Sequence, residues 1–337
     1  MMIDVHGHAS VPAAAALAQS SPGFEAQLAA NSSRYRDPQT AAYMNRITPE
    51  WDHRLVAVSE RMKMMNATGI ASQFVSINPG QYYYWADESL ATDLVETVNH
   101  HIAGLATDHP SAIVPIATVA LQHPNLATEQ LRDAMICKGM AGVQISTSAG
   151  GRDLSSPEFE SLWSAAEETG AMIILHPLGS KELLDRLAPS YLNNIVGQPF
   201  ESTLAISHLI FSGVLDRHPD LRICSVHGGG YFPHYLGRGD HAWGVRPDSH
   251  SMDRKPSEYL DRFWFDSLVH SPAILRALID VVGADRVVIG TDYPFDMGDE
   301  HPDRTLASLD WLLPVDRQLI ARENALSLLG RHAGRLV

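Results

Sequence analysis

Short apolar runs alternate with longer amphipathic stretches along nearly the whole sequence, and this alternation limits the fold more than any other feature. Each run has the length and the apolar character of a buried strand. The eight runs are Met2–Val5, Gln73–Ile77, Ile113–Val119, Gly142–Ile145, Met172–Leu175, Arg222–Val226, Phe263–Leu268 and Val287–Ile289. Such alternation is typical of βα units around a parallel sheet. The sequence therefore predicts an α/β fold, a (β/α)8 TIM barrel, in which reactive groups collect at the carboxyl ends of the strands.

Two of the intervening stretches carry helix signals at both ends. In one, Ser156 can cap a helix that Gly170 ends, and in the other Ser271 and Gly283 take the same places. The apolar stripe of the second stretch comprises Ile274, Leu275, Leu278, Ile279 and Val282. Both stretches therefore predict helices that pack one face against the sheet.

The length of 337 residues fits one barrel, because such barrels exceed about 200 residues around a single core. Two segments break the rhythm, Ala9–Glu50 after the first run and Tyr231–Leu260 after the sixth, and both follow runs that end in histidine. We therefore expect a single domain over residues 1–337, with residues 9–50 and 231–260 as insertions over the functional site.

The formal net charge of -14 argues against nucleic acid and anionic membranes as partners, because both would require a basic surface. No run approaches the roughly 18 apolar residues of a membrane span, and the first residues lack the pattern of a secretory signal. Only two cysteines are present, which fits a reducing compartment. The expected location is the cytoplasm.

Five residues with metal-binding or acid–base side chains stand where apolar runs stop. His6 and His8 end the first run, His176 follows the fifth, His227 follows the sixth and Asp292 follows the eighth. Residues two apart on a strand point to the same side, and the strand ends converge in a barrel. A structural role would explain any one histidine alone, but the set favours a site for a divalent metal, with zinc suited to imidazole ligands.

The segments "IDVHGH", "ILHP", "VHGGGYFP" and "GTDYPF" resemble signature segments of the amidohydrolase superfamily. The nearer resemblance is to its decarboxylase branch, typified by 2-amino-3-carboxymuconate-6-semialdehyde decarboxylase, and it runs from Ile3 to about Leu329. It implies that His6, His8, His176 and Asp292 bind one metal, usually zinc with manganese as the alternative. It also implies that His227 is the catalytic acid–base, and Asp292 is expected to relay a proton besides binding metal.

Many members of the superfamily hold a second metal through a carbamylated lysine at the end of the fourth strand. Gln144 and Ser146 stand at that place here, and the nearest lysine, Lys138, precedes the strand. The resemblance therefore implies a centre with a single metal.

A divalent cation and a neighbouring histidine can support the loss of CO2 from an acid without an organic cofactor. The first hypothesis is accordingly a metal-dependent, non-oxidative decarboxylase, a carboxy-lyase acting on a small unsaturated or aromatic carboxylic acid in catabolism. A hydrolase or hydratase acting on an amide, a lactone or a conjugated acid is the alternative, since the fold does not decide between them. A binding protein with a relic barrel is the third hypothesis.

Contacts to the substrate are less defined. The resemblance implies that Arg238 grips a substrate carboxylate in the neighbouring subunit, and hence a homodimer, although an ordinary ion pair would also explain this arginine. Phe295 is a candidate pocket wall. The family's second carboxylate-binding arginine aligns near Pro49, and Arg46 and Arg54 lie out of register.

Further aromatic and histidine side chains have either a pocket role or a packing role. Tyr82, Tyr83, Tyr84 and Trp85 follow the second run, where they could stack on a planar substrate or pack a loop against the barrel. His234, His241 and His270 are further candidates to face the pocket.

Overall fold

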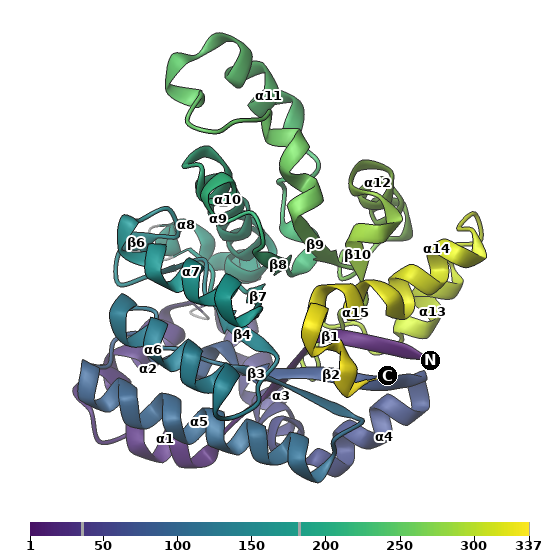
Figure 1. Ribbon diagram of the computed structural model, residues 1–337. Coiled ribbons are helices and arrows are strands. Elements are labelled where there is room, and N and C mark those ends of the chain that lie inside the picture. The colour runs from purple at the N-terminus through teal and green to yellow at the C-terminus, as the bar shows by residue number, and fades with distance from the viewer. Residues whose placement is uncertain (35–36, 181–182, 337) are drawn as a thin grey trace.

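Eight parallel strands form a closed barrel in the computed structural model, which describes residues 1–34, 37–180 and 183–336 (Figure 1). The order around the barrel is β1 (Met2–Ala9), β2 (Ile70–Ile77), β3 (Ile113–Ala117), β4 (Gly142–Ile145), β7 (Met172–Leu175), β8 (Arg222–Ser225), β9 (Phe263–Asp266) and β10 (Val287–Val288). Isolated parallel bridges from Asp4 to Ile289 and from Gly7 to Tyr293 join the last strand region to the first. The predicted (β/α)8 barrel is confirmed.

All eight predicted runs are strands, and the bounds of β4 and β7 match the prediction. The largest difference is at β1, which continues past Val5 to Ala9 and includes both histidines. Its pairing with β2 is irregular between Asp4 and Gly7, where the register shifts. A small hairpin of β5 (Ser148–Ala149) and β6 (Arg152–Asp153) follows β4 and lies outside the barrel sheet.

Helices surround the barrel and lie between successive strands (Figure 1). Their bounds are α1 Pro12–Ala18, α2 Pro22–Arg34, α3 Pro38–Val56, α4 Val58–Thr68, α5 Glu88–Asp108, α6 Pro124–Ile136, α7 Glu160–Thr169, α8 Leu184–Leu187, α9 Gln198–Phe211, α10 Val214–Arg217, α11 Leu236–Val245, α12 Pro272–Val282, α13 Pro302–Ala307, α14 Pro314–Gln318 and α15 Asn324–Leu329. Within the described ranges, none of them combines the length and the apolar character that a membrane span requires.

The predicted helix ends are found at α7 and α12. The Ser156 side chain accepts a hydrogen bond from the Glu158 amide in a short 3-10 turn that leads into α7, and Gly170 ends that helix with a positive φ of 64°. Ser271 accepts from the Ile274 amide at the start of α12. The predicted stripe of α12 is wrong at Ile274, which is 46% exposed because it lies at the edge of the buried face.

The barrel interior and the layer beneath the helices are two separate apolar clusters. Ile173 and Leu175 of β7 pack in the outer cluster, whereas Met172 and Ile174 belong to a second cluster that includes Leu328 and Leu329 of α15. Because side chains alternate along a strand, the second cluster fills the inside of the barrel. His176 follows Met172 and Ile174 at the same two-residue spacing, so its imidazole points to the same side, the inside of the barrel.

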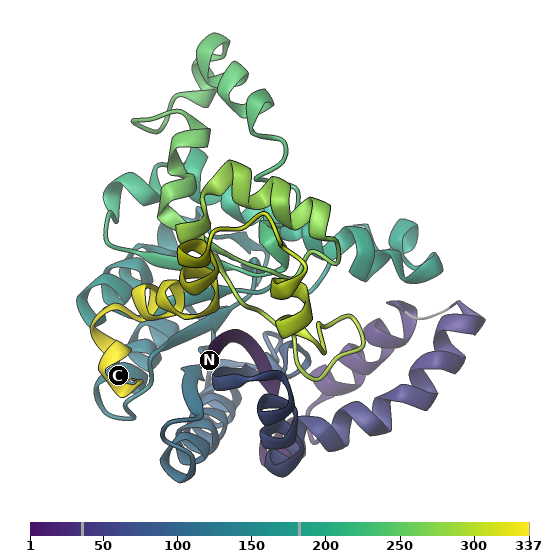
Figure 2. The same cartoon turned by 90° about the vertical axis from the view of Figure 1, so that its right-hand side faces the viewer.

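The two insertions differ in where they go. The first forms α1, α2 and α3, of which α3 runs beyond the predicted bound to Val56, and its residues 35–36 lie outside the described residues, as does residue 337 of the predicted domain. The second carries α11, which buries none of its residues and stands clear of the barrel in both ribbon views (Figures 1 and 2). Within one chain, α11 extends away from the barrel instead of covering it, although its Leu236 and Trp243 pack partly buried against the outer cluster.

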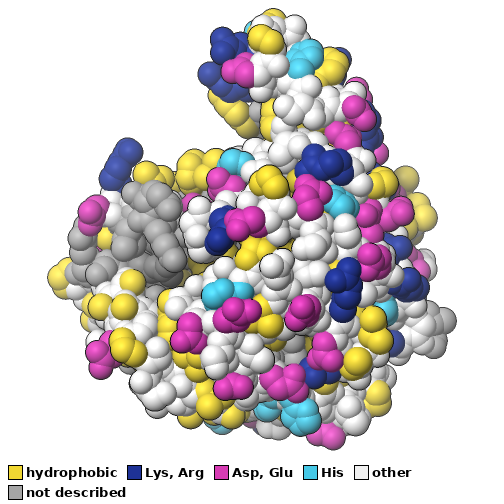
Figure 3. All heavy atoms as spheres, turned by 60° about the vertical axis from the view of Figure 1, so that its left-hand side comes forward, with side chains coloured by type: hydrophobic (Ala, Val, Ile, Leu, Met, Phe, Trp, Pro, Cys, Tyr) yellow, Lys and Arg dark blue, Asp and Glu magenta, His cyan; other side chains and the backbone are white. Residues whose placement is uncertain are grey.

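Acidic and basic side chains interleave on the face shown in Figure 3, where the described residues form no continuous basic surface. This distribution agrees with the formal net charge of -14.

Candidate metal centre

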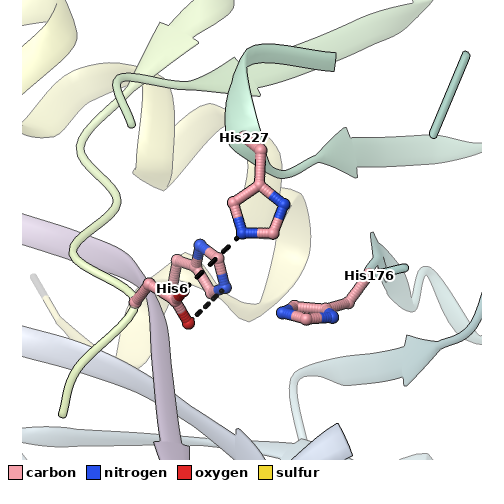
Figure 4. Close-up of side chains that lie close together, drawn as sticks. His6, His176 and His227 are labelled. Carbon is pink, nitrogen blue, oxygen red and sulfur yellow. Dashed lines mark ion pairs between the residues drawn. The ribbon is translucent and has the colours of Figure 1, made fainter. Parts of the chain in front are cut away.

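The five strand-end residues converge at one end of the barrel. Candidate ligand atoms of His6, His176, His227 and Asp292 all lie within 4.8 Å of one another. Figure 4 shows the rings of the three histidines around a common centre. His8 adjoins the same group, since its Nε2 lies 3.0 Å from Asp292 Oδ1 and 3.1 Å from His6 Nε2.

The Nδ1 atoms of three histidines are held from outside the centre, which leaves each Nε2 facing inward. His6 Nδ1 donates to Asp266 Oδ2 at 2.8 Å, and His176 Nδ1 donates to the Pro177 carbonyl at 2.8 Å. His8 Nδ1 lies 3.3 Å from Ser76 Oγ. An outer partner of this kind fixes the tautomer and the ring orientation of a metal-binding histidine.

His227 is arranged differently from the other three histidines. Its Nε2 lies 3.7 Å from Asp292 Oδ2, and its buried Nδ1 has no hydrogen-bond partner among the described residues. Its side chain is 14% exposed, whereas the side chains of His6 and His8 are fully buried. Its φ of 55° is uncommon outside glycine, as is the equal φ of Asp292. His227 is thus the least buried of the four histidines, and its Nδ1 is not held by another residue of the described structure.

The electrostatics of His176, His8 and Asp292 favour the forms that bind a cation. His6 differs, since burial lowers its pKa but Asp292 and Asp266 outweigh burial and raise that pKa above its usual value. Burial lowers the pKa of His176 well below its usual value, and the neighbouring histidines lower it further. Burial likewise lowers the pKa of His8. Burial raises the pKa of Asp292, but the charge of His6 and hydrogen bonds to other histidines outweigh it and hold that pKa well below its usual range. Neutral imidazoles and an ionised carboxylate are the states that metals require.

The residues present fit a divalent cation. His176 Nε2 is buried in the described structure without a hydrogen-bond partner, and it faces the other candidate ligand atoms. Unpartnered buried polar atoms are costly, and a cation would satisfy them. Several imidazole nitrogens and one carboxylate oxygen suit zinc and related divalent ions.

The end of β4, where related proteins hold a second metal, carries Gln144, and the side chain of Gln144 is engaged in hydrogen bonds. Gln144 Oε1 accepts from Ser76 Oγ at 2.6 Å, and Gln144 Nε2 donates to the Ile77 carbonyl at 3.0 Å. Lys138 lies outside the barrel, where its ammonium pairs with Glu96 and Asp133. Neither side chain is placed to bridge two ions.

Asp266, at the end of β9, is a residue of the site that the sequence reasoning missed. Its Oδ2 accepts from His6, while its Oδ1 accepts from the Gly228 amide at 2.9 Å and the Leu268 amide at 3.3 Å. One carboxylate thus contacts a candidate ligand and the residue next to His227. Its position at the end of the seventh run, in "FDSLVHSP", was the available signal.

Aromatic rings line one side of the centre. Phe295 lies with its ring centroid 5.7 Å from that of His8, and Trp51 of α3 packs edge-on against Phe295 at 5.3 Å. Trp51 is buried and was not predicted as a site residue, because nothing in the sequence relates the first insertion to the eighth strand. The helix α3, which begins within the predicted insertion and continues past its bound at residue 50, therefore reaches the edge of the site.

The remaining predicted substrate contacts are exposed in one chain or contact residues other than the candidate ligands. Arg238, His234, His241 and His270 are all exposed. Arg46 lies over the Tyr43 ring, and Arg54 pairs with Glu300 at 3.3 Å. Arg54 also lies over the ring of Tyr293, the residue after Asp292, at 5.0 Å, and so reaches the segment that bears this candidate ligand.

The aromatic stretch after β2 packs mainly within the protein. Tyr82 and Tyr84 stack at 5.0 Å, and both lie in or against the outer core. Trp85 Nε1 donates to Gln27 Oε1 of α2 at 2.6 Å, so this stretch anchors the first insertion. Of the two roles considered for it, these contacts favour packing.

Known proteins share this architecture. The family model described as Amidohydrolase matches residues 3–331. The chain is 33% identical over 274 residues to 2-amino-3-carboxymuconate-6-semialdehyde decarboxylase of Dictyostelium discoideum, over 80% of this chain and 76% of that protein. It is 26% identical over 291 residues to gamma-resorcylate decarboxylase of Rhizobium sp. (strain MTP-10005), over 82% of this chain and 88% of that protein.

A solved structure with the same fold is that of a dihydroxybenzoic acid decarboxylase from Polaromonas sp. JS666 with bound manganese and the inhibitor 2-nitroresorcinol. Its TM-score is 0.80 at 20% identity, and the match covers 97% of this chain and 96% of that chain. At this identity the likeness shows the fold.

Proposed function

This chain belongs to the amidohydrolase family, and from that premise we propose that it is a metal-dependent, non-oxidative decarboxylase of a small aromatic or unsaturated carboxylic acid. The observation that carries the proposal is the convergence of four histidines and Asp292 at the barrel end. Relatives named as decarboxylases, at 33% and 26% identity, support the reaction class. The gamma-resorcylate decarboxylase supports an aromatic substrate.

His6, His8, His176 and Asp292 would hold the cation, and His227 would remain free as the acid–base. The held Nδ1 atoms of His6, His8 and His176, and the unheld ring of His227, support this division. A bound divalent cation supplies positive charge that orients and polarises the substrate carboxylate group.

The reaction replaces the bond between carbon and CO2 by a bond between that carbon and hydrogen, so one proton must be delivered as CO2 leaves. His227 Nε2 would deliver that proton to carbon, as suits an imidazole near neutral pH. Asp292 Oδ2, 3.7 Å away, would stabilise the protonated ring and relay the proton. Phe295 and Trp51 would exclude water and pack against the planar acid.

We propose zinc as the metal, with manganese as the alternative. The histidine-rich ligand set supports zinc, and the manganese in the Polaromonas structure supports the alternative. Elemental analysis of purified protein, followed by activity after reloading each ion, decides between them.

We also propose a homodimer of single-domain subunits, each spanning residues 1–337 with insertions at 9–50 and 231–260, in which Arg238 reaches the partner's substrate. The exposed arm of α11 supports this proposal, since Tyr235 beside it and Val245 at its end are 70% and 61% exposed. The exposed free thiol of Cys137 fits a reducing compartment, and we propose a cytoplasmic location.

A screen for CO2 release tests the function. Metal-loaded protein is incubated with hydroxybenzoates, aminobenzoates and semialdehyde acids, and CO2 and the decarboxylated product are measured. Release of CO2 from at least one acid, lost in the His227→Ala protein, is expected. Conversion of a substrate without CO2 would instead identify a hydrolase or a hydratase.

A further inference from the structure

Arg61 of α4 is a buried cation behind the candidate metal centre. It is 2% exposed, and within the described part of the chain no carboxylate forms an ion pair with it. Its guanidinium donates to the His8 carbonyl and to Gln73 Oε1, and it lies over the Tyr293 ring at 4.7 Å. Burying a charge without a counter-ion is costly, so these contacts must offset a substantial penalty.

The contacts of Arg61 continue through Gln73 to Asp4. Gln73 Nε2 donates to Asp4 Oδ2 at 2.6 Å, and Asp4 is fully buried. Asp4 in turn accepts from the His6 amide at 3.0 Å and from the Thr291 hydroxyl at 2.6 Å. We call Arg61, Gln73 and Asp4 the seam network. It contacts two of the three segments that carry candidate ligands, residues 4–8 and 291–293, and not the segment that carries His176.

The seam network lies where the barrel closes. The first and last strands meet there through isolated bridges, with the Asp292 amide donating to the His6 carbonyl at 2.8 Å. A Cβ atom on Gly7 would lie 2.5 Å from Gln73 Cδ, so glycine between the two histidines leaves room for the Gln73 side chain. A larger residue between His6 and His8 would therefore require the Gln73 side chain of this network to move.

We propose that Arg61 is a positioning residue of the metal centre, which acts through the His8 carbonyl, Gln73 and Tyr293 to fix the angle between the segments bearing His8 and Asp292. The inference rests on the proposed function. Arginine suits this place because its planar fork donates in two directions while its face covers an aromatic ring. Lysine retains the charge but has neither the fork nor the flat face.

The test measures cobalt(II) binding to metal-stripped protein through its visible absorption, without reference to turnover. We expect Arg61→Met to bind cobalt about tenfold or more weakly, with an altered absorption band, because displaced outer contacts weaken metal sites by that amount. Arg61→Lys should lie between Arg61→Met and the wild type. Arg317→Met is the matched control, since Arg317 is half-buried and also donates to two backbone carbonyls, those of Leu306 and Leu309, outside the candidate centre.

Thermal unfolding of all variants separates positioning from general stability. The proposal requires that Arg317→Met lose stability but keep the cobalt affinity and band of the wild type. Wild-type affinity and band in Arg61→Lys would overturn it, even if Arg61→Met does not fold, and so would an equal loss of affinity in Arg317→Met. The proposed function fails by a different result, in which the wild type binds metal yet releases no CO2.

Discussion

Asp266→Asn changes the charge of one buried carboxylate with almost no change in size, and we expect it to weaken metal binding more than folding. Asparagine has one acceptor oxygen, which can retain the Gly228 amide now bound at 2.9 Å. Its amino group must then face His6 Nδ1, which at present donates to Asp266 at 2.8 Å. The His6 proton would move to Nε2, the nitrogen that faces the candidate centre.

The size of the effect follows from the bond that is lost. A hydrogen bond to a charged group contributes roughly 1.5–3 kcal/mol, and each 1.4 kcal/mol corresponds to about tenfold in affinity. We therefore expect metal affinity to fall by about tenfold to a hundredfold, in line with other outer partners of metal-binding histidines. The loss of folding free energy should be nearer 1 kcal/mol, because the Gly228 contact remains and a neutral hydrogen bond replaces the charged one.

The assay is competition for the metal between the metal-stripped protein and a chelator, with unfolding by denaturant measured in parallel. Asp216→Asn is the control, because Asp216 is half-buried and accepts from the Tyr259 hydroxyl at 2.5 Å and the Asp253 amide at 3.1 Å, with no histidine bound. It should lose stability and keep its metal. Metal affinity within about twofold of the wild type in Asp266→Asn would refute the tautomer argument.

Three further outcomes are expected. His227→Ala should keep its metal content by elemental analysis while CO2 release falls by about a hundredfold or more, and loss of the metal would instead make His227 a ligand. Arg238→Ala should raise KM, and mixing it with His176→Ala should restore part of the activity if Arg238 serves the partner's site; no rescue would exclude that role. The hydrogen bond to Arg217 holds the pKa of Glu160 below its usual 4.5, so its contribution to stability is present above that value and lost as pH falls through the lower folded pKa. The difference in Tm between the wild type and Glu160→Gln should thus be measurable near pH 7 and shrink as the pH falls below the usual pKa of glutamate, and a difference that stays constant through that fall would contradict this account.

The strands and their histidine ends could be predicted because both signals are local. A run such as Met172–Leu175 is apolar within a few residues, and His176 stands directly after it. The outer partners could not be predicted in this way. Asp266 reaches His6 across 260 residues of sequence, and Trp51 meets Phe295 only when the first insertion folds back against the eighth strand.

The direction in which α11 extends could also not be predicted from the sequence. Leu236 and Trp243 pack against the outer cluster while Tyr235 and Val245 are exposed, so the apolar pattern gave no indication whether the insertion covers the site or leaves it. Arg61 was likewise not singled out, because a lone arginine in a helix is more often solvated than buried.

The seam of the barrel has a consequence for how the protein is made. His6 and Asp292 stand near opposite ends of the polypeptide, and neither can meet the other until the last strand has left the ribosome and docked. The complete set of proposed ligands would thus form only after the last strand has docked on the first, late in the assembly of the barrel.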